Sequence, residues 1–218
     1  MAKKLFFVYT TPAFYSDLYS PVMKSAFDGR ADVKVYFSMD NGILLDTLEN
    51  DVVPTASVKN RVYSILSNCE KAGADCVVVG CTAINTAVHE LLPLFDVPVV
   101  SVDETMIQNI VQDGRKRVAV LSHTPINAMT IERRLKAEDP GIEVALFPVA
   151  GAADAFAGER EKFAPLMKAA AEQVPADKFD CIALGHISAE NVDFSNVKLP
   201  VYKCGESTVA AVNAILNR

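Results

Sequence analysis

The chain has 218 residues, of which 50% are hydrophobic, so it can bury the core of one large or two small domains. Its net charge is −6 at pH 7 and its basic residues are mostly scattered, which makes nucleic acid a poor candidate partner. The five cysteines form no CxxC pair, and no apolar run approaches about 18 residues. Composition therefore predicts a cytoplasmic protein with free thiols and neither a zinc site nor a membrane span.

Apolar runs and helical patterns alternate along the chain. Runs typical of strands buried on both faces lie at residues 5–9, 76–79, 97–99, 118–121, 181–184 and 199–201. Apolar residues at helical spacing predict a helix that begins near Val58 and ends at Gly73. Further helices are expected at residues 84–93, 104–112, 126–137, 159–173 and 206–217. The Ala- and Gly-rich residues 150–158 are expected to form a mobile loop.

The chain also contains an internal repeat. The run from Asp75 to Cys81 returns in the same pattern as the run from Asp180 to His186. In both copies an apolar run ends at a glycine, and the next residue is a cysteine in the first copy and a histidine in the second. Two further blocks return in the same order, residues 3–12 as 116–125 and residues 97–105 as 199–207. This order indicates that a half-chain unit has been duplicated.

Strands that alternate with helices predict an α/β fold with mainly parallel sheets. The repeat divides the fold into two pseudosymmetric, Rossmann-like α/β/α lobes. The first is residues 1–113, joined by the C-terminal helix 206–218, and the second is residues 114–205. Because ligands of open parallel sheets bind beyond the carboxyl ends of the strands, we expect the active site in a cleft between the lobes.

The segments that follow the predicted strands carry the side chains that could bind a substrate. Hydroxyls and unpaired backbone N–H groups at such positions suit a small anion, for example a carboxylate. The expected substrate-binding residues are Thr10, Thr11, Thr82, Asn85, His123, Thr124, Ile187 and Ser188. Polar residues of these types also cap helices and turns without touching a ligand, and the sequence leaves both roles open.

The two residues that differ between the copies are the candidate catalysts. A helix N-terminus lowers the pKa of a cysteine thiol, which makes Cys81 a candidate base or nucleophile. His186 could act as the opposing acid, and His123 competes with it for that role. His89 is expected on a helix surface. The remaining thiols fit structural positions: Cys69, Cys76, Cys181 and Cys204.

The sequence resembles the cofactor-independent aspartate/glutamate racemase superfamily, which includes hydantoin racemase, maleate isomerase and arylmalonate decarboxylase. Gly80-Cys81-Thr82 after an apolar strand is similar to the first-lobe motif of that family, and the likeness extends over nearly the whole chain. The resemblance implies a small carboxylate substrate, such as an amino acid, and proton transfer at the carbon next to the carboxylate. It further implies two opposed thiols, no pyridoxal phosphate or other cofactor, and a homodimer by analogy.

The chain departs from the family pattern at the second thiol, where His186 stands. A cysteine and a histidine could still exchange protons on opposite faces of one carbon. One nucleophile with one acid would also suit addition to a double bond, as in maleate isomerase, and a single competent face would suit decarboxylation. A carboxylate-binding protein without turnover is the alternative from another class, and the sequence leaves these options open.

Overall fold

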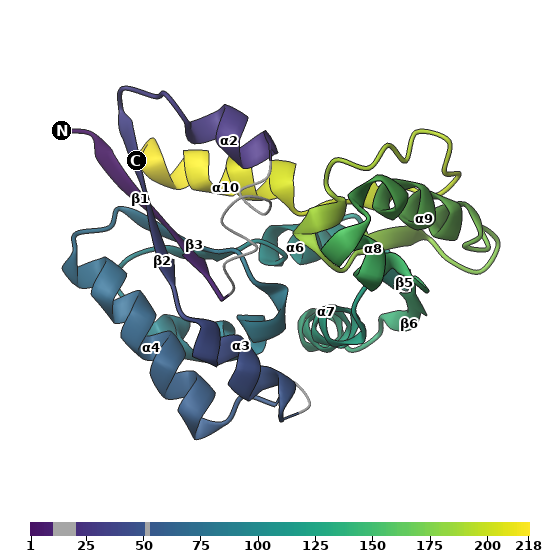
Figure 1. Cartoon of the computed structure of the whole chain (residues 1–218), viewed down its shortest axis with the longest axis horizontal. Helices are drawn as coiled ribbons and strands as arrows, with labels where there is room; N and C mark the ends of the chain where they lie inside the picture. Colours follow the sequence, from purple (N-terminus) through teal and green to yellow (C-terminus); the bar gives the residue numbers. More distant parts are fainter. Residues whose placement is uncertain (11–20, 51–52) are drawn as a thin grey trace. The chain divides into compact units, whose positions relative to one another are not determined.

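The structure, a computed structural model, describes residues 1–10, 21–50 and 53–218. The chain forms two compact units, Met1–Val102 with Gly205–Arg218, and Asp103–Cys204. The described part of each unit holds a four-stranded parallel sheet with helices packed beside it (Figure 1). The predicted α/β class with two lobes is therefore confirmed. The division falls before helix α6 (Glu104–Gln112), whereas the predicted division falls after this helix.

The first unit is built on four strands in the order β2-β1-β3-β4. They are β1 (Lys3–Tyr9), β2 (Val33–Met39), β3 (Cys76–Val79) and β4 (Val99–Ser101). Two helices of this unit contact each other, α2 (Pro21–Phe27) and α10 (Gly205–Leu216) (Figure 1). A second group of contacting helices comprises α3 (Asn41–Leu48), α4 (Ala56–Lys71) and α5 (Asn85–Leu91). The 3-10 turns η1 (Thr82–Ile84) and η2 (Leu92–Leu94) flank α5.

Helix α4 forms where the apolar periodicity predicts a helix. Its N-cap is Thr55, whose Oγ1 accepts a hydrogen bond from the backbone N–H of Val58 at 3.2 Å. The apolar stripe of the helix is buried, and the chain leaves the helix through Gly73, whose φ of +80° is in the left-handed region that favours glycine. The predicted helix is confirmed, and it begins two residues before Val58.

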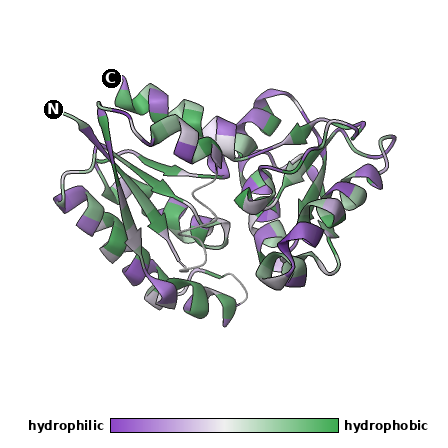
Figure 2. Ribbon diagram, turned by 45° about the horizontal axis from the view of Figure 1, so that its top comes forward, coloured by the Kyte–Doolittle hydropathy of each residue, from purple (hydrophilic) through white to green (hydrophobic). Residues whose placement is uncertain are grey.

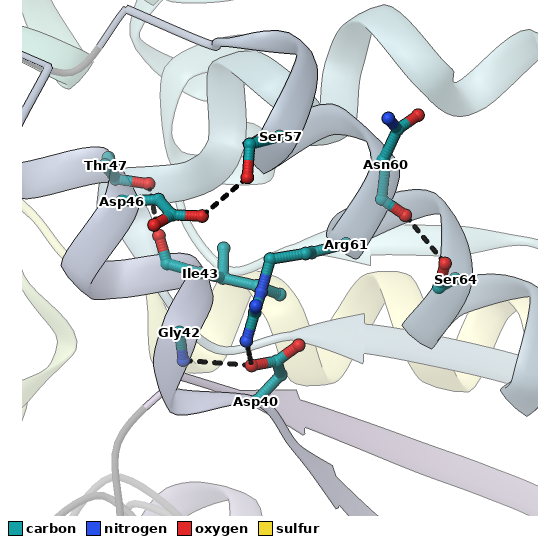
Figure 3. Close-up of polar contacts among 9 residues, drawn as sticks. All are labelled: Asp40, Gly42, Ile43, Asp46, Thr47, Ser57, Asn60, Arg61 and Ser64. Atoms are coloured by element: carbon teal, nitrogen blue, oxygen red, sulfur yellow. Dashed lines mark hydrogen bonds and ion pairs between the residues drawn. The ribbon is translucent and has the colours of Figure 1, made fainter.

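A small polar network joins α3 to α4 (Figure 3). The Asp40 carboxylate caps α3 by accepting the backbone N–H of Gly42 at 2.9 Å, and it also pairs with the Arg61 guanidinium of α4. The Ser57 hydroxyl of α4 donates to the Asp46 carboxylate of α3 at 2.8 Å. Because α3 also contacts η1, this network supports the turn that follows the end of β3.

The second unit repeats the strand order as β6-β5-β7-β8. Its strands are β5 (Arg117–Ser122), β6 (Glu143–Pro148), β7 (Cys181–Leu184) and β8 (Val201–Tyr202). Its helices are α6, α7 (Pro125–Glu138), α8 (Ala152–Gly158) and α9 (Arg160–Glu172), with the 3-10 turn η3 (Ile187–Ala189). The strands of both units are mainly hydrophobic, whereas the helices also carry hydrophilic residues (Figure 2). Apolar side chains of β5, β7, α8 and α9 form one buried cluster.

Matched positions of the repeat make the same hydrogen bonds in the two units. The Asp75 carboxylate accepts the backbone N–H of Lys4 at 2.8 Å, and the Asp180 carboxylate accepts that of Arg117 at 2.9 Å. In return the backbone N–H groups of Asp75 and Asp180 donate to the carbonyls of Lys4 and Arg117, at 2.8 and 2.7 Å. These bonds fix the register of the two central strands in each sheet, which explains why the repeated runs begin with aspartate.

The glycines that end the repeated runs also have equivalent surroundings. A Cβ atom on Gly80 would lie 2.3 Å from Cε1 of Tyr9, and one on Gly185 would lie 2.8 Å from Cβ of Ser122. Neither glycine has a positive φ. Glycine is therefore needed at these strand ends for close packing against the adjacent strand.

One local prediction was wrong. Residues 150–158, expected as a mobile loop, contain helix α8, which begins after Gly151 at φ +72°. Alanine is the best helix former, and Ala152 and Ala155 are buried in the core of the second unit, so the segment is ordered by packing. Among the described residues, no helix is both long enough and apolar enough to span a membrane.

Candidate active site

Cys81 lies at the carboxyl end of β3, directly after Gly80. Strands β1 and β3 pair with Val8 opposite Val79, so the residues that follow these strands come together. The Thr10 hydroxyl donates to Sγ of Cys81 at 3.0 Å, and both side chains are buried. A hydrogen bond donated to sulfur stabilises a thiolate relative to the neutral thiol. The structure thus brings two of the predicted site residues into direct contact.

Two further predicted residues lie just beyond Cys81. Thr82 opens η1 and Asn85 is the first residue of α5, and both are buried. Oδ1 and Nδ2 of Asn85 have no hydrogen-bond partner among the described residues. Leaving a buried polar group unsatisfied costs about 1–3 kcal/mol, so the Asn85 amide is suited to a polar ligand. Thr11 lies outside the described residues.

His186 occupies the equivalent strand end in the second unit, after β7 and Gly185. Its Nδ1 accepts the backbone N–H of Ser188 at 3.1 Å and lies 2.7 Å from the Ser188 hydroxyl oxygen. Ile187, between them, is buried. Burial and the neighbouring His123 lower the pKa of His186 well below its ordinary value, so the imidazole is neutral at pH 7.

His123 follows β5 and packs edge-to-face against His186, with 4.7 Å between the ring centroids. Phe156 of α8 and Phe163 of α9 lie 5.2 and 5.3 Å from the His123 ring. Burial among these rings lowers the pKa of His123 to about 4. Two predicted site residues are thus brought together as a neutral imidazole pair. The two phenylalanines were missed because their apolar character indicates only a core position.

Thr124, the last of the predicted binding residues, is the N-cap of α7. Its backbone N–H donates to the Ser122 hydroxyl oxygen at 3.2 Å, whereas its Oγ1 is buried without a partner among the described residues. The Nδ1 of His123 is unsatisfied in the same way. The strand end of the second unit therefore also presents polar atoms suited to a ligand.

Asp103 is a buried carboxyl group that sequence reasoning missed. It precedes α6, where an aspartate ordinarily caps the helix, but its side chain makes no capping hydrogen bond. Both carboxyl oxygens lack a partner within the described part of the chain. Burial, with a smaller effect of Glu104, raises the pKa of Asp103 to about 7. Only the tertiary structure distinguishes this group from an ordinary cap.

The other cysteines are buried, and His89 is exposed on α5. Burial raises the pKa of both Cys76 and Cys181 to about 12, so these thiols stay protonated at neutral pH. In the residues that the structure describes, no group of three or more His, Cys, Asp and Glu side chains is arranged to hold a metal ion.

The family model for Asp/Glu/Hydantoin racemase matches residues 25–212, and the chain belongs to this family. No curated protein matches the chain in sequence. Among solved structures, it is similar to the aspartate racemase of Picrophilus torridus, with a TM-score of 0.74, 15% identity and coverage of 99% of this chain and 95% of that one.

Two other solved structures show the same fold. The glutamate racemase of Francisella tularensis, in complex with D-glutamate, has a TM-score of 0.67 at 12% identity, with 99% of this chain and 81% of that chain covered. The maleate isomerase of Pseudomonas putida S16 has a TM-score of 0.63 at 15% identity, with coverages of 100% and 94%. The fold is therefore shared by relatives with different named activities.

Proposed function

We propose that this protein is a cofactor-independent racemase or isomerase of a small carboxylate, with Cys81 as its base or nucleophile. The observation that carries the proposal is the buried hydrogen bond from the Thr10 hydroxyl to Sγ of Cys81, 3.0 Å long, at the end of a central strand. A sulfur held by a donor favours the thiolate, the form that takes up a proton or attacks carbon. Membership of the racemase family supports the same role.

In the proposed reaction the Cys81 thiolate removes the proton from the carbon next to the substrate carboxylate and becomes a thiol. The electron pair of the C–H bond moves into the carboxylate, which gains negative charge. Hydrogen-bond donors that meet this charge stabilise the transition state. The Asn85 amide and the Thr82 hydroxyl are proposed to bind the carboxylate, and His186 is proposed to act on the same substrate as a donor, either of a proton or of a hydrogen bond. Return of a proton to carbon completes the cycle.

A second candidate function follows from the residue at the second strand end. Histidine at position 186 leaves Cys81 as the one thiol at the two matched positions. A single nucleophile with an acid would suit addition to a double bond, and a single proton donor to carbon would suit decarboxylation. A carboxylate-binding protein remains the non-enzymatic candidate. These candidates differ in turnover and in the fate of the proton on carbon.

The test is proton exchange in D2O. The protein is incubated with aspartate, glutamate and a panel of small 2-substituted carboxylates, and deuterium at the carbon next to the carboxylate is followed by NMR. We expect exchange in the wild type without added pyridoxal phosphate and none in Cys81→Ser. Cys69→Ser is the matched control, because the Cys69 thiol lies 3.6 Å from the Ser38 hydroxyl in a position suited to a second hydroxyl. Equal exchange in Cys81→Ser would refute the proposal, and saturable binding without exchange would favour a binding protein.

A further inference from the structure

The hydrogen bonds at His186 define which ring nitrogen carries its proton. A backbone N–H can only donate, so Nδ1 of His186, which accepts the N–H of Ser188 at 3.1 Å, carries no hydrogen. The Ser188 hydroxyl, whose oxygen is 2.7 Å from the same nitrogen, must then donate to it as well. A neutral imidazole with an unprotonated Nδ1 has its hydrogen on Nε2.

The surroundings of the ring oppose a second proton. His123 packs edge-to-face against it from the end of β5, and Phe156 packs from α8 at 6.2 Å between centroids. An imidazolium in this place would lose its hydration among these rings, so the neutral ring is favoured.

We infer that Ser188 is a positioning residue that fixes His186 as the neutral tautomer with its proton on Nε2, so that His186 presents a hydrogen-bond donor and no base at its other nitrogen. Ser188 is one of the predicted substrate-binding residues. The geometry instead directs its hydroxyl and its backbone N–H to the imidazole.

For the proposed function, on which this step rests, the neutral tautomer limits what His186 can do in the reaction. A neutral imidazole that gave up its Nε2 proton outright would become an imidazolate, which is too basic to form near neutral pH. His186 therefore donates a hydrogen bond to the negative charge that develops on a substrate oxygen, as neutral imidazoles do in other proton-transfer enzymes. The proton on carbon then leaves to Cys81 and returns from it on the same face, so deuterium exchange should outpace inversion of the stereocentre. Within the proposed function, this favours an isomerase over a racemase.

The tautomer is tested in the resting protein, whether or not it turns over a substrate. The full-length chain is labelled with 15N at histidine, and long-range 1H–15N correlations are recorded between pH 5.5 and pH 8.5. The chain has three histidines, and loss of one signal set in His186→Gln assigns the residue. We expect a protonated Nε2, an unprotonated Nδ1 and no titration of His186 over this range. A proton on Nδ1, or titration near pH 6.5, would overturn the inference.

Two variants isolate the role of the Ser188 side chain. Ser188→Ala removes the hydroxyl donor but leaves the backbone N–H, and Ser188→Thr keeps both. In Ser188→Ala we expect the two 15N shifts to move towards each other, as the tautomers mix, and the pKa of His186 to rise; Ser188→Thr should restore the wild-type pattern. An unchanged pattern in Ser188→Ala would assign the tautomer to the backbone alone and refute the role of the side chain.

Turnover provides a second readout. If a substrate is found, Ser188→Ala should lower kcat by about tenfold, since one donor to the transition state becomes misoriented, and Ser188→Thr should recover it. Inversion as fast as exchange in the wild type would contradict the hydrogen-bond-donor role. If no substrate turns over, the proposed function fails, while the 15N result still decides the tautomer.

Discussion

The buried carboxyl of Asp103 should make the protein less stable as the pH rises. Its pKa in the folded state is about 7, against 3.8 for the ordinary group, so the folded chain binds this proton more tightly than the unfolded chain does. The associated stability is fully present below about pH 4 and is lost as the pH rises to 7 and above. The rise of the pKa from 3.8 to about 7 corresponds to about 4 kcal/mol in total, of which about 3 kcal/mol falls between pH 5 and pH 8.5.

The variant Asp103→Asn removes this titration while keeping the size of the side chain. The quantity to compare is the free energy of unfolding of Asp103→Asn minus that of the wild type. We expect this difference to be about 3 kcal/mol larger at pH 8.5 than at pH 5. Urea unfolding at several pH values, followed by circular dichroism, measures the difference. Asp154→Asn, at an exposed position on α8, is the matched control and should run parallel to the wild type. Parallel profiles for Asp103→Asn as well would refute the reasoning.

Two further predictions concern the strand end of the first unit. Thr10→Val should slow alkylation of Cys81 by iodoacetamide at pH 7 by about tenfold or more, because it removes the donor to sulfur, whereas Thr10→Ser should react like the wild type. Equal rates for the two variants would show that the hydroxyl is unimportant. Gly80→Ala should lower the free energy of unfolding by about 1–3 kcal/mol, because the new Cβ would overlap Tyr9. Gly158→Ala should change this free energy little, because no atom lies within 4 Å of its new Cβ. Chemical denaturation compares the two.

The duplicated scaffold could be predicted from the sequence because the residues that build it act locally. A continuous apolar run such as Cys76–Val79 has few alternatives to a buried strand, and the buried stripe of α4 has helical spacing. Strand β2 was missed because it is largely exposed at the sheet edge and lacks a continuous buried run. Helix α8 was missed because alanine and glycine suit a loop as well as a packed helix, and only the surrounding core decides between them.

The candidate site could be predicted as a set of positions, but not as a set of interactions. The repeat singled out Cys81 and His186, and the pairing of β1 with β3 explains why Thr10 meets the thiol. No pattern in the sequence indicates that His123 and His186 pack together among apolar rings. Phe156, one of these rings, comes from a segment that was expected to be a loop. The charge state of both imidazoles depends on this packing.

The two units share a scaffold but treat their equivalent strand ends differently. In the first, a hydroxyl donates to the sulfur of Cys81, which favours a negative charge on the side chain. In the second, aromatic rings and burial favour a neutral side chain at His186. In the proposed reaction, a group that stays neutral cannot take up a proton in exchange for one that Cys81 would give. Histidine at position 186 therefore fits chemistry in which one residue carries the proton and the other stabilises charge. It fits the role of a second proton-carrying thiol less well.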